Sequence, residues 1–468
     1  MTERGYQPPV TLPDPPARVH FVGIGGIGMS GLARIFLARG YDVSGSDAQQ
    51  SDQTDALVSI GIPVSIGHTD TARAGRADLV VATAAAPATN PELVAARNAN
   101  RLIAKRAAAL GALANARRCV AVAGSHGKST TSGMVTTALL ALGRDPSYAV
   151  GAIVGASGVN ASPGRGEEMV VEADEYDYSF LTLTPDVAIV TNVEFDHPDL
   201  FPDQDAYDAA FCRFIRQIRP GGTLVMSADD PGCHRLLDNP LFHWPDHIAW
   251  FGESAQAGWR LIANGAVWQA RTPDGQIVSL NLGVPGRHNA LNALAALAAL
   301  VTLGVSPGDG AKALETFAGV GRRFEMKGEA AGVTVIDDYA HHPTEVRATL
   351  LAARQRYPTR RIWAVFQPHT YSRTKALLDE WPGGFTAADR VMLLDIYAAR
   401  ETDDLGVTSD DIASRLWGNP LRAGEPADAA SQLSQAVEPG DVVITLGAGD
   451  VTKAGPMLLS LLNGAVTR

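Results

Sequence analysis

The stretch VHFVGIGGIGMSGLARIF, residues 19–36, decides how the chain begins to fold. Its first four residues predict a buried parallel strand, and its last eight have the spacing of a helix. Between them, Gly23, Gly25 and Gly28 form the pattern GxGxxG. Such a turn lets backbone amides approach a phosphate at the positive end of the helix dipole. The stretch therefore predicts a Rossmann-like nucleotide-binding domain.

An acidic residue, Asp47, ends the next predicted strand, DVSGSD. Rossmann domains place an acid there to bind a ribose hydroxyl. This motif fits NAD(P), but it fits equally well another ribose-linked diphosphate such as a UDP-sugar or FAD, and a purely structural tight turn is a third reading. We expect Asp47 and the glycines to contact such a nucleotide; the glycines are Gly23, Gly25, Gly26 and Gly28.

Composition sets the broad class of the protein. A chain of 468 residues with 46% hydrophobic and 19% charged residues is predicted to form about three domains. The formal charge of −11 argues against nucleic-acid binding. The three cysteines lack paired or metal-ligand spacing, and the longest apolar stretch, 293–303, is shorter than the ~18 residues of a membrane span. We expect a cytoplasmic protein that is a monomer or weak homodimer, with no nucleic-acid or membrane partner.

Strands and helices alternate along nearly the whole chain, which is typical of the α/β class. The alternation restarts after a second glycine loop and again after the segment GVGRRFE. We therefore predict three domains. They are a Rossmann-like N-terminal domain over residues 1–116, a central P-loop ATPase-like α/β domain over 117–324, and a Rossmann-like C-terminal domain over 325–468.

The second glycine loop, GSHGKSTT at residues 124–131, stands between a predicted strand and a predicted helix. In phosphate-binding loops, backbone amides and a lysine hold the phosphates while a hydroxyl binds Mg²⁺. The loop is a short variant, because Val122 stands where the standard pattern has a glycine. We expect ATP or GTP here rather than an incidental surface lysine. The expected ligands are Gly124, Ser125, His126, Gly127, Lys128, Ser129 and Thr130.

Acidic side chains gather after the next two predicted strands, at Glu172, Asp174, Glu175 and Asp196, followed by His197. Neighbouring carboxylates repel unless a divalent cation supplies opposite charge. Ser129 and Glu172 are expected to hold one Mg²⁺, and His197 to help hold a second. The alternative for the aspartates and Glu175 is a role in capping or solvating loops.

Two further groups lie near the second domain boundary. An arginine of the pair Arg322 and Arg323 could reach a transferring phosphoryl group, while a salt bridge is the alternative for one of the two. His288 and Asn289 begin a predicted helix, where Asn289 is either an ordinary N-cap or a contact to a nucleotide base.

Two predicted strands of the last domain end in the segments DDYAHHPTE and FQPHTYSRT, residues 337–345 and 366–374. Ligands bind outside the carboxyl ends of strands in such sheets. A guanidinium there suits a small carboxylate, and histidine or aspartate side chains suit its amine. A zinc site at His341 and His342 is disfavoured because no third ligand of suitable spacing accompanies them.

Together these motifs resemble the Mur ligases of bacterial cell-wall synthesis, most closely the branch that adds alanine. The motifs that carry the resemblance span nearly the whole chain and occur in the same order as in the family. The motifs that carry it are GIGGIGMSGLA, GSHGKSTT, EADEYDYSFL, TNVEFDHPD, PGRHNALNALAA, GVGRRFE, DDYAHHPTE, FQPHTYSRT and LGAGD.

The resemblance implies an ATP-dependent ligase that activates the lactyl carboxylate of UDP-N-acetylmuramate as an acyl phosphate and joins it to L-alanine. It implies that Lys128 holds phosphate oxygens, that Ser129 and Glu172 bind the first Mg²⁺, and that Glu172 and His197 bind the second. It further implies that the nucleotide contacts are His288, Asn289, Arg323 and Asp338, and that the alanine end is formed by Tyr339, His341 and Arg373. The first glycine turn then holds the UDP end of the substrate.

Some positions depart from the family pattern. Ser125 and Ser129 replace commoner threonines but keep the hydroxyl, Thr370 stands where some members carry arginine, and Arg400 replaces a usual glycine. Several sister ligases use a carbamylated lysine, and residues 191–219 contain no lysine, so none is expected here. The alternatives are a murein-peptide recycling ligase acting on the same nucleotide, an NAD(P) oxidoreductase and a nucleotide-gated binding protein.

Overall fold

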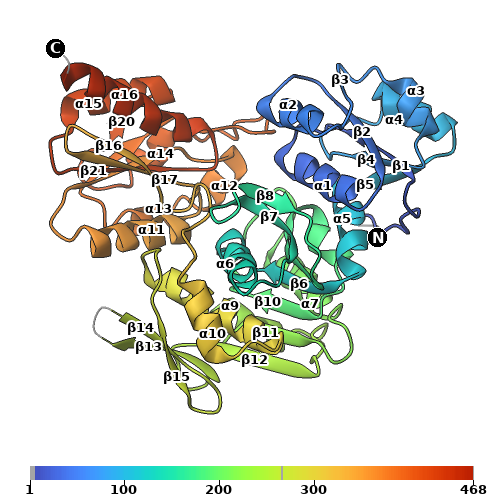
Figure 1. The fold of residues 1–468 in the computed structure, drawn as a ribbon. Coiled ribbons are helices and arrows are strands. Elements are labelled where there is room, and N and C mark those ends of the chain that lie inside the picture. The colour runs from blue at the N-terminus through green and yellow to red at the C-terminus, as the bar shows by residue number, and fades with distance from the viewer. Residues whose placement is uncertain (1–5, 265–266, 467–468) are drawn as a thin grey trace. The chain divides into compact units, whose positions relative to one another are not determined.

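The computed structural model describes residues 6–264 and 267–466 (Figure 1). The chain divides into two compact units. Unit 1 comprises Met1–Glu194, Asp205–Asn281 and Asn292–Phe317. Unit 2 comprises Phe195–Gln204, Leu282–Leu291 and Ala318–Arg468. Two short segments from the middle of the sequence therefore belong with the C-terminal part of the chain.

Unit 1 begins with a five-stranded, wholly parallel sheet in the order β3-β2-β1-β4-β5. Its strands are β1 Arg18–Val22, β2 Asp42–Asp47, β3 Val64–Ile66, β4 Leu79–Ala82 and β5 Leu102–Lys105. Its helices are α1 Ile27–Ala38, α2 Asp52–Ser59, α3 Thr71–Arg76, α4 Pro91–Asn98 and α5 Arg106–Asn115. Because β1 pairs with both β2 and β4, the chain reverses its direction of winding beside β1, where Rossmann sheets bind ligands.

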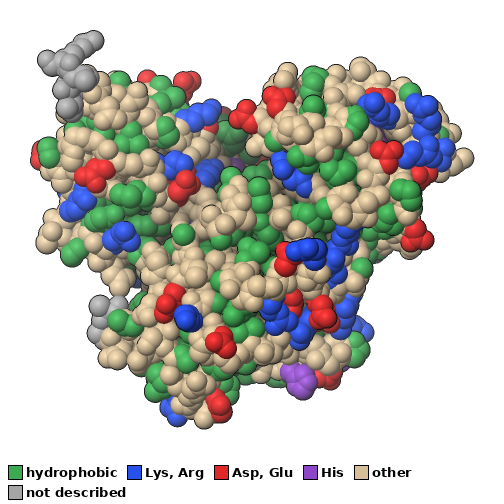
Figure 2. All heavy atoms as spheres, viewed as in Figure 1, with side chains coloured by type: hydrophobic (Ala, Val, Ile, Leu, Met, Phe, Trp, Pro, Cys, Tyr) green, Lys and Arg blue, Asp and Glu red, His purple; other side chains and the backbone are tan. Residues whose placement is uncertain are grey.

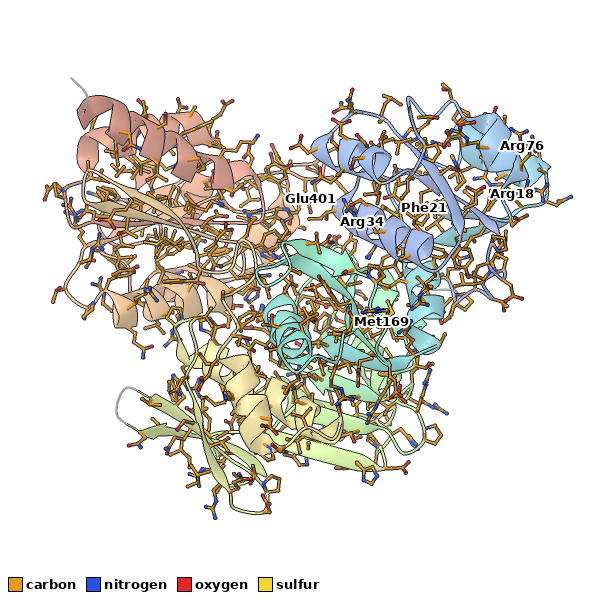
Figure 3. All side chains as sticks on the ribbon, in the orientation of Figure 1. Arg18, Phe21, Arg34, Arg76, Met169 and Glu401 are labelled. Carbon is orange, nitrogen blue, oxygen red and sulfur yellow. The ribbon has the colours of Figure 1, made fainter. Side chains whose placement is uncertain are left out.

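The apolar run of β1 forms a strand because it is covered on both faces, as parallel sheets require. Val19, Phe21 and Val22 are completely buried. The Phe21 ring packs edge to face on Phe36 of α1, with 5.7 Å between ring centroids. Figure 3 shows Phe21 among the elements of this first sheet and Met169 in the second.

The second sheet of unit 1 has ten strands in the order β15-β14-β13-β12-β11-β10-β6-β9-β7-β8. Its first strands are β6 Arg118–Ala123, β7 Ser147–Val154, β8 Val159–Ser162, β9 Glu168–Glu172 and β10 Val187–Val190. The others are β11 Thr223–Ser227, β12 His247–Gly252, β13 Trp259–Asn264, β14 Val267–Arg271 and β15 Ile277–Leu280. The helices are α6 Lys128–Ala141, η1 Tyr176–Thr182, α7 Gln204–Ile215, α8 Pro231–Leu237, α9 Arg287–Thr302 and α10 Pro307–Leu314.

The apolar sequence of α9 is explained by its burial. Alanines and leucines from Ala293 to Leu300 are at most 1% exposed on every side of the helix. A helix that is apolar all round belongs inside a domain. By contrast, the hairpin of β7 and β8 was not expected, because glycine and serine interrupt its apolar alternation.

Within unit 1, helices α1 and α5 of the first sheet closely approach elements of the second sheet. A Cβ placed on Gly31 of α1 would lie 2.6 Å from Ala161 Cβ of β8, and one on Gly111 of α5 would lie 2.5 Å from the Thr182 carbonyl oxygen of η1. Asn160 Nδ2 also donates to the Ile27 carbonyl at 3.1 Å. The first sheet is thus packed against the second through helices α1 and α5.

Unit 2 has a six-stranded sheet in the order β16-β17-β21-β18-β19-β20, parallel except for β16. Its strands are β16 Glu325–Ala330, β17 Val333–Asp338, β18 Ile362–Phe366, β19 Arg390–Leu393, β20 Leu421–Arg422 and β21 Val442–Leu446. Its helices are α11 Pro343–Arg356, α12 Tyr371–Ala376, α13 Trp381–Gly384, α14 Ser409–Ala413, α15 Pro426–Ala436, η2 Asp450–Lys453 and α16 Ala454–Val466.

Two apolar cores lie on the two faces of this sheet. One contains Val346 of α11 and Trp381 of α13, and the other contains Leu433 of α15 and Leu458 of α16. Figure 1 shows α15 and α16 on one side of these strands and α11 and α13 on the other. The predicted α/β fold class is confirmed; the exact domain boundaries at 116 and 324 stay predictions.

The described helices include none long and apolar enough to cross a bilayer. On the face drawn in Figure 2, basic and acidic side chains are interspersed rather than gathered by sign.

The contact between α5 and η1 yields a stability prediction. Alanine is normally the better helix former by about 1 kcal/mol, but a methyl group on Gly111 has no room beside the Thr182 carbonyl. We expect Gly111→Ala to lower the free energy of unfolding in urea by about 1–3 kcal/mol. The control is Gly308→Ala in α10, where a Cβ meets nothing within 4 Å and the change should be neutral or stabilising. Equal behaviour of the two variants would contradict the described packing.

Candidate active site

The first glycine turn is held by the end of β2. The amides of Gly23 and Ile24 donate to the Ser46 carbonyl at 2.8 and 2.9 Å. Gly23 has a φ of +81°, and a Cβ on it would lie 2.5 Å from Thr83 Cγ2. Asp47 Oδ2 accepts the Gly25 amide at 2.8 Å, so this carboxylate fixes the turn. A contact between Asp47 and a nucleoside stays a prediction.

Helix α1 presents an open N-terminus after this turn. It begins at Ile27 with Gly26 as its N-cap, and among the described residues no side chain caps it. The first amides of a helix have no intrahelical acceptor, and they carry the positive end of the dipole. The geometry suits an anion that approaches Ile27 and Gly28.

A pocket of about 300 Å³ opens at this N-terminus within unit 1. Arg106, the first residue of α5, lines it, and a Cβ on Gly28 would lie 3.3 Å from Arg106 Cδ and Nη1. Glu172 and Asp174, after β9, line the same pocket. One pocket thus joins an anion-binding helix end and a guanidinium to the carboxylates of the central sheet. Sequence reasoning missed Arg106, although a cation directly after a predicted strand was a usable signal.

The second glycine loop needs its glycines for close approaches. Gly124 has a φ of +132°, and a Cβ on it would lie 2.0 Å from Thr191 Oγ1. Gly127 has a φ of +82°, and a Cβ on it would lie 2.8 Å from Asn292 Oδ1. Side chains are therefore excluded at both bends, and α6 starts directly at Lys128.

Ser125 and His126 anchor this loop to the chain that follows β10. Ser125 Oγ donates to the Glu194 carbonyl at 2.6 Å and lies 2.9 Å from Tyr207 Oη. The His126 amide donates to Asn192 Oδ1 at 2.9 Å, and its ring Nε2 lies 2.7 Å from Glu194 Oε2. The Ser125 amide also donates, to the Asn192 carbonyl at 3.1 Å. The side chains and amides of both residues are therefore engaged within the protein, and their contacts to a nucleotide stay predictions.

Lys128 lies in a strongly acidic environment. Its Nζ donates to the Gly124 carbonyl at 2.7 Å and forms an ion pair of 2.8 Å with Glu175 Oε2. Burial lowers the pKa of Lys128, but Glu175, Asp174 and Glu172 outweigh burial and raise it. The lysine therefore stays charged. Glu175, for which a loop role was one reading, is instead the fully buried partner of this lysine.

The expected metal ligands of unit 1 follow β9 and begin α6. Glu172 Oε2 accepts the Gly151 amide at 2.7 Å, and the residue is only partly buried at the rim of the pocket. Ser129 and Thr130 are 6% and 8% exposed at the second and third positions of α6. Lys128, Ser129 and Glu172 thus belong to adjacent strand ends of one sheet, where β6 pairs with β9.

In unit 2, Arg373 forms a buried ion pair that the sequence did not predict. Its Nε and Nη2 donate to Asp196 Oδ1 at 2.9 and 2.7 Å, and its Nη1 lies 3.2 Å from His369 Nδ1. Burial raises the pKa of Asp196, but Arg373 and the neighbouring histidines lower it well below its usual range. Asp196 also accepts the amide of His197, whose φ is +57°. Arg373 therefore fixes the segment that carries His197.

Arg322 and Arg323 have different surroundings. Arg322 donates to Asp337 Oδ2 at 3.1 Å and to the Gly447 carbonyl at 2.7 Å, so it is the structural member of the pair. Arg323 lies 3.7 Å from Glu345 Oε1. Both guanidinium groups stand over the Tyr339 ring, at 4.9 and 5.1 Å from its centroid. Arg323 remains the candidate for a phosphate.

Asp338 ends β17 as a buried carboxyl group. It accepts the amides of Phe324 and Ala340, both at 2.8 Å. Burial raises its pKa to about 6, although Arg323 and these two amides act in the opposite direction. The two oxygens of Asp338 therefore fix the backbone at Phe324 and Ala340. Its contact to the ribose of ATP stays a prediction.

Four rings form a row across the strand ends of unit 2. Successive centroid distances are 5.3 Å from Tyr339 to His341, 5.8 Å from His341 to His369 and 5.8 Å from His369 to Tyr397. Burial lowers the pKa of His341 to about 3 and that of His369 to about 4, so both rings are neutral.

The hydrogen bonds fix the tautomer of each neutral ring. His341 Nδ1 lies 3.0 Å from the Tyr339 carbonyl, which can only accept, so Nδ1 carries the proton and Nε2 is an acceptor. His369 Nδ1 faces Arg373 Nη1, which can only donate, so here Nε2 carries the proton. Of the two Nε2 atoms, that of His341 can accept a hydrogen bond and that of His369 can donate one.

His288 and Asn289 lie in the first turn of α9. Burial lowers the pKa of His288 to about 4, and Arg323 adds to the effect. The helix begins at Arg287, and Asn289 Nδ2 donates to the Pro285 carbonyl at 2.6 Å. The reading of Asn289 as an N-cap is therefore wrong, because an N-cap precedes the helix and accepts. Its contact to a nucleotide base stays a prediction.

The predicted site residues fall into two groups. Unit 1 holds the glycine turn, Asp47, the loop 124–130 and Glu172. Unit 2 holds His197, His288, Asn289, Arg323, Asp338, Tyr339, His341 and Arg373.

The neutral histidines of unit 2 yield a prediction on pH. Between pH 6.5 and about 4 the unfolded chain binds protons that folded His288, His341 and His369 do not bind. The free energy of unfolding should therefore fall as the pH is lowered through this range, against a smaller opposite contribution from Asp338. His288→Gln should flatten the dependence by up to roughly 1.4 kcal/mol per pH unit, measured by urea unfolding. An unchanged slope would show that His288 is not held neutral.

The comparisons with known proteins agree along most of the chain. Residues 18–118 match the catalytic domain of the Mur ligase family, residues 122–300 the Mur ligase middle domain, and residues 322–449 the Mur ligase glutamate ligase domain. A UDP-N-acetylmuramate–L-alanine ligase of Paenarthrobacter aurescens is 46% identical over 96% of this chain and 97% of its own length. One of Mycobacterium ulcerans is 43% identical over 96% of each chain.

Solved structures show the same architecture. The UDP-N-acetylmuramate–alanine ligase of Thermotoga maritima aligns with a TM-score of 0.76 at 28% identity, over 96% of this chain and 100% of that one. A murein peptide ligase of Psychrobacter arcticus aligns with a TM-score of 0.70 at 25% identity, over 96% and 99%. Three matched domains and relatives above two-fifths identity show that this chain belongs to the Mur ligase family.

Proposed function

We propose that this chain joins L-alanine to the lactyl carboxylate of UDP-N-acetylmuramate, with ATP cleaved to ADP and phosphate. The pocket of unit 1 carries the proposal. It is lined by the first residues of α1 and by Arg106, and also by Glu172 and Asp174. A substrate with a diphosphate at one end and a carboxylate to be phosphorylated at the other suits this combination of groups.

The diphosphate would bind at the glycine turn. The free amides at the start of α1 donate to its oxygens, and Arg106 supplies charge beside Gly28. Asp47 keeps Gly25 in place rather than touching the diphosphate. Under this proposal the glycine turn, although similar to that of NAD(P) enzymes, binds the diphosphate of the substrate. The proposal is therefore an alternative to the hypothesis of an NAD(P) oxidoreductase.

ATP would bind at the second glycine loop. Gly124, Ser125 and His126 form the bend, and the amides from Gly127 to Thr130 at the start of α6, together with the charged Lys128, suit its phosphates. His288, Asn289, Arg323 and Asp338 are proposed for the rest of the nucleotide, on the family resemblance. A MurF ligase of Thermotoga maritima, of the same fold at a TM-score of 0.60, has been solved with ADP.

The donor set of the site fits a magnesium ion. Among the described residues here, three carboxylates, Glu172, Asp174 and Glu175, outnumber the two cations Lys128 and Arg106, so the region can accept added positive charge. Glu172 and Ser129 would hold one Mg²⁺, and His197 with Glu172 is proposed for a second. Bound there, Mg²⁺ neutralises phosphate oxygens so that a carboxylate can approach them.

In the first step, a lactyl carboxylate oxygen attacks the γ-phosphorus of ATP. The bond from that phosphorus to the bridging oxygen breaks, which yields an acyl phosphate and ADP. Lys128 and Arg323 are proposed to stabilise the oxygens of the transferred group, because charge spreads over them in the transition state. Both side chains keep their charge without any proton transfer.

In the second step, the neutral amine of alanine attacks the acyl carbon, the bond from that carbon to the phosphate oxygen breaks, and the proton lost from nitrogen leaves with the phosphate as hydrogen phosphate. An ammonium must first lose a proton. That proton passes to solvent, because burial lowers the pKa of His341 to about 3 and makes its ring a weak base. His341 Nε2, the acceptor of its ring, is proposed to accept a hydrogen bond from the neutral amine, while His369 Nε2–H and Tyr339 orient the amino acid.

Arg373 is proposed to act on the carboxylate of alanine mainly through its remaining guanidinium edge. Two of its nitrogens are bound to Asp196, and Thr370 cannot supply a second guanidinium. The cytoplasm, where ATP and the nucleotide substrate occur, is the proposed location of the reaction. The monomer or weak dimer stays a prediction.

A coupled assay of ADP release tests the function. We expect release to require both UDP-N-acetylmuramate and L-alanine, since neither step can finish without its acceptor. The matched comparison replaces L-alanine with a murein tripeptide. Faster release with the tripeptide would make the chain a recycling ligase, and equal release without either acceptor would leave only an ATPase.

Single variants test the roles of the phosphate loop. Lys128→Ala and Glu172→Ala should each reduce kcat by about a hundredfold or more, because transition-state charge loses its partners. The control is Lys312→Ala on the exposed face of α10, expected to keep the wild-type rate.

Loss of Lys128 also leaves Glu175 buried without its ion pair, so circular dichroism must show that each variant is folded. The double variant Lys128→Ala with Glu175→Gln removes that burden and should remain inactive. Near-normal rates in a folded variant would contradict the assignment.

A further inference from the structure

The carboxylate of Glu345 lies beside two groups of the proposed site, although the proposed reaction assigns it no role. Glu345 is in the first turn of α11, and its side chain is 10% exposed. Its Oε1 lies 3.7 Å from Arg323 Nη1, and its Oε2 lies 3.3 Å from His341 Nδ1. The same Oε2 accepts the His341 amide at 3.0 Å. One carboxylate therefore contacts both the arginine proposed for the transferred phosphoryl group and the histidine proposed for the amine.

Capping of α11 explains only part of this arrangement. The helix dipole favours an acid in the first turn, and a glutamate at the third position commonly accepts the amide of the N-cap residue. Here the N-cap is His342, whose side chain accepts the Thr344 amide at 3.3 Å. Glu345 instead accepts the amide of His341, one residue earlier, and its second oxygen lies beside Arg323. Its contacts thus connect the end of the helix to the side chains of the site.

The contact with Arg323 is electrostatic, because 3.7 Å exceeds the length of a hydrogen bond. An arginine side chain has many rotamers, so its guanidinium is fixed only by partners that restrict it. The Tyr339 ring lies under the guanidinium, at 5.1 Å from the ring centroid, and Glu345 supplies negative charge beside Nη1. Glu345 therefore helps to keep this guanidinium near Tyr339 before any phosphate binds.

The contacts with His341 act on its tautomer and on its backbone. Nδ1 of the ring faces two acceptors, the Tyr339 carbonyl at 3.0 Å and Glu345 Oε2 at 3.3 Å. Both favour the proton on Nδ1, so Nε2 keeps the lone pair that is proposed to meet the amine. Burial lowers the pKa of His341, and the negative charge of Glu345 acts in the opposite direction. The accepted amide in turn fixes the chain that carries the ring.

We propose that Glu345 is a positioning residue that couples the two steps of the reaction by holding Arg323 and His341 in one arrangement. The inference rests on the proposed function, which supplies what these two side chains bind. Water that attacks the acyl carbon in place of the amine breaks the bond from that carbon to the phosphate oxygen and releases the carboxylate, hydrogen phosphate and a proton. A well-placed amine prevents this loss of the intermediate. Glu345 thus favours formation of the amide over hydrolysis of the acyl phosphate.

The amounts of ADP and amide formed in one reaction with ATP, UDP-N-acetylmuramate and L-alanine test this proposal. The wild type should form equal amounts of the two. Glu345→Gln keeps the size of the side chain but removes its charge, so it should release more ADP than amide. It should also lower kcat for the amide about tenfold or more and raise the KM for L-alanine. The KM for UDP-N-acetylmuramate should not change, because this substrate is proposed to bind in the pocket of unit 1.

Two further variants separate positioning from stability. Glu345→Asp keeps the charge at a shorter reach and should restore part of the coupling that Glu345→Gln loses. Asp428→Asn removes a carboxylate from the matching third position of α15, on the other face of the sheet (Figure 1), and should keep the wild-type ratio of ADP to amide. Loss of folded protein alone lowers ADP and amide together. An equal fall of both in Glu345→Gln, or an unchanged ratio, would therefore overturn the proposal.

Circular dichroism shows whether each variant is folded. If Glu345→Gln does not fold, the ratio in Glu345→Asp decides, and a wild-type ratio there overturns the proposal.

A double-mutant cycle tests the route of the effect. If Glu345 acts through its two partners, Glu345→Gln should change kcat less in a chain that already carries Arg323→Ala. It should likewise change the KM for L-alanine less in a chain that already carries His341→Ala. Full additivity in both cycles would show that Glu345 acts through neither residue, against the proposal.

The wild type distinguishes failure of this inference from failure of the proposed function. If it forms the amide from UDP-N-acetylmuramate and L-alanine but Glu345→Gln still yields equal amounts of ADP and amide, only the role of Glu345 is wrong. If the wild type forms no amide from these substrates, the proposed function itself is wrong.

Discussion

Parallel strands end at one edge of their sheet, and this constraint organises most of the candidate chemistry in the chain. The glycine turn follows β1, Lys128 and its loop follow β6, and Glu172 ends β9. In unit 2, Asp338 ends β17 and His369 follows β18. The strands supply rigid positions, while the loops after them supply the polar and charged side chains. Chemistry and fold therefore share the same few residues.

Two cations at these strand ends already form ion pairs within the protein. Lys128 is held by Glu175, and Arg373 is held by Asp196. Each cation thus has a fixed direction before any substrate arrives, which reduces the reorganisation needed during reaction. The folded state is therefore sensitive to substitution at these positions, because removing one member of a buried ion pair leaves the charge of the other uncompensated.

Local signals allowed much of this arrangement to be predicted from the sequence. The strand, turn and helix around Gly23 and around Lys128 are contiguous, so their spacing reveals them. Partners that are distant in the sequence leave no such signal. Arg106 meets Gly28, Asp196 meets Arg373, and Glu92 meets Ser46 only through the order in which the strands are assembled. The hairpin of β7 and β8 was missed for a different reason, because its glycines weaken the apolar pattern.

The pairing of Arg373 with Asp196 also bears on how far the C-terminal part of the chain is a separable module. The chain passes between the two units after residues 194, 204, 281, 291 and 317, rather than through one linker. A fragment cut at the sequence boundary near residue 325 would lack Asp196 and would leave a guanidinium that is 4% exposed without its carboxylate. Recombination among related ligases at that boundary would carry the same defect unless both partners were inherited together. The unit of exchange in this fold is therefore larger than the last domain as the sequence delimits it.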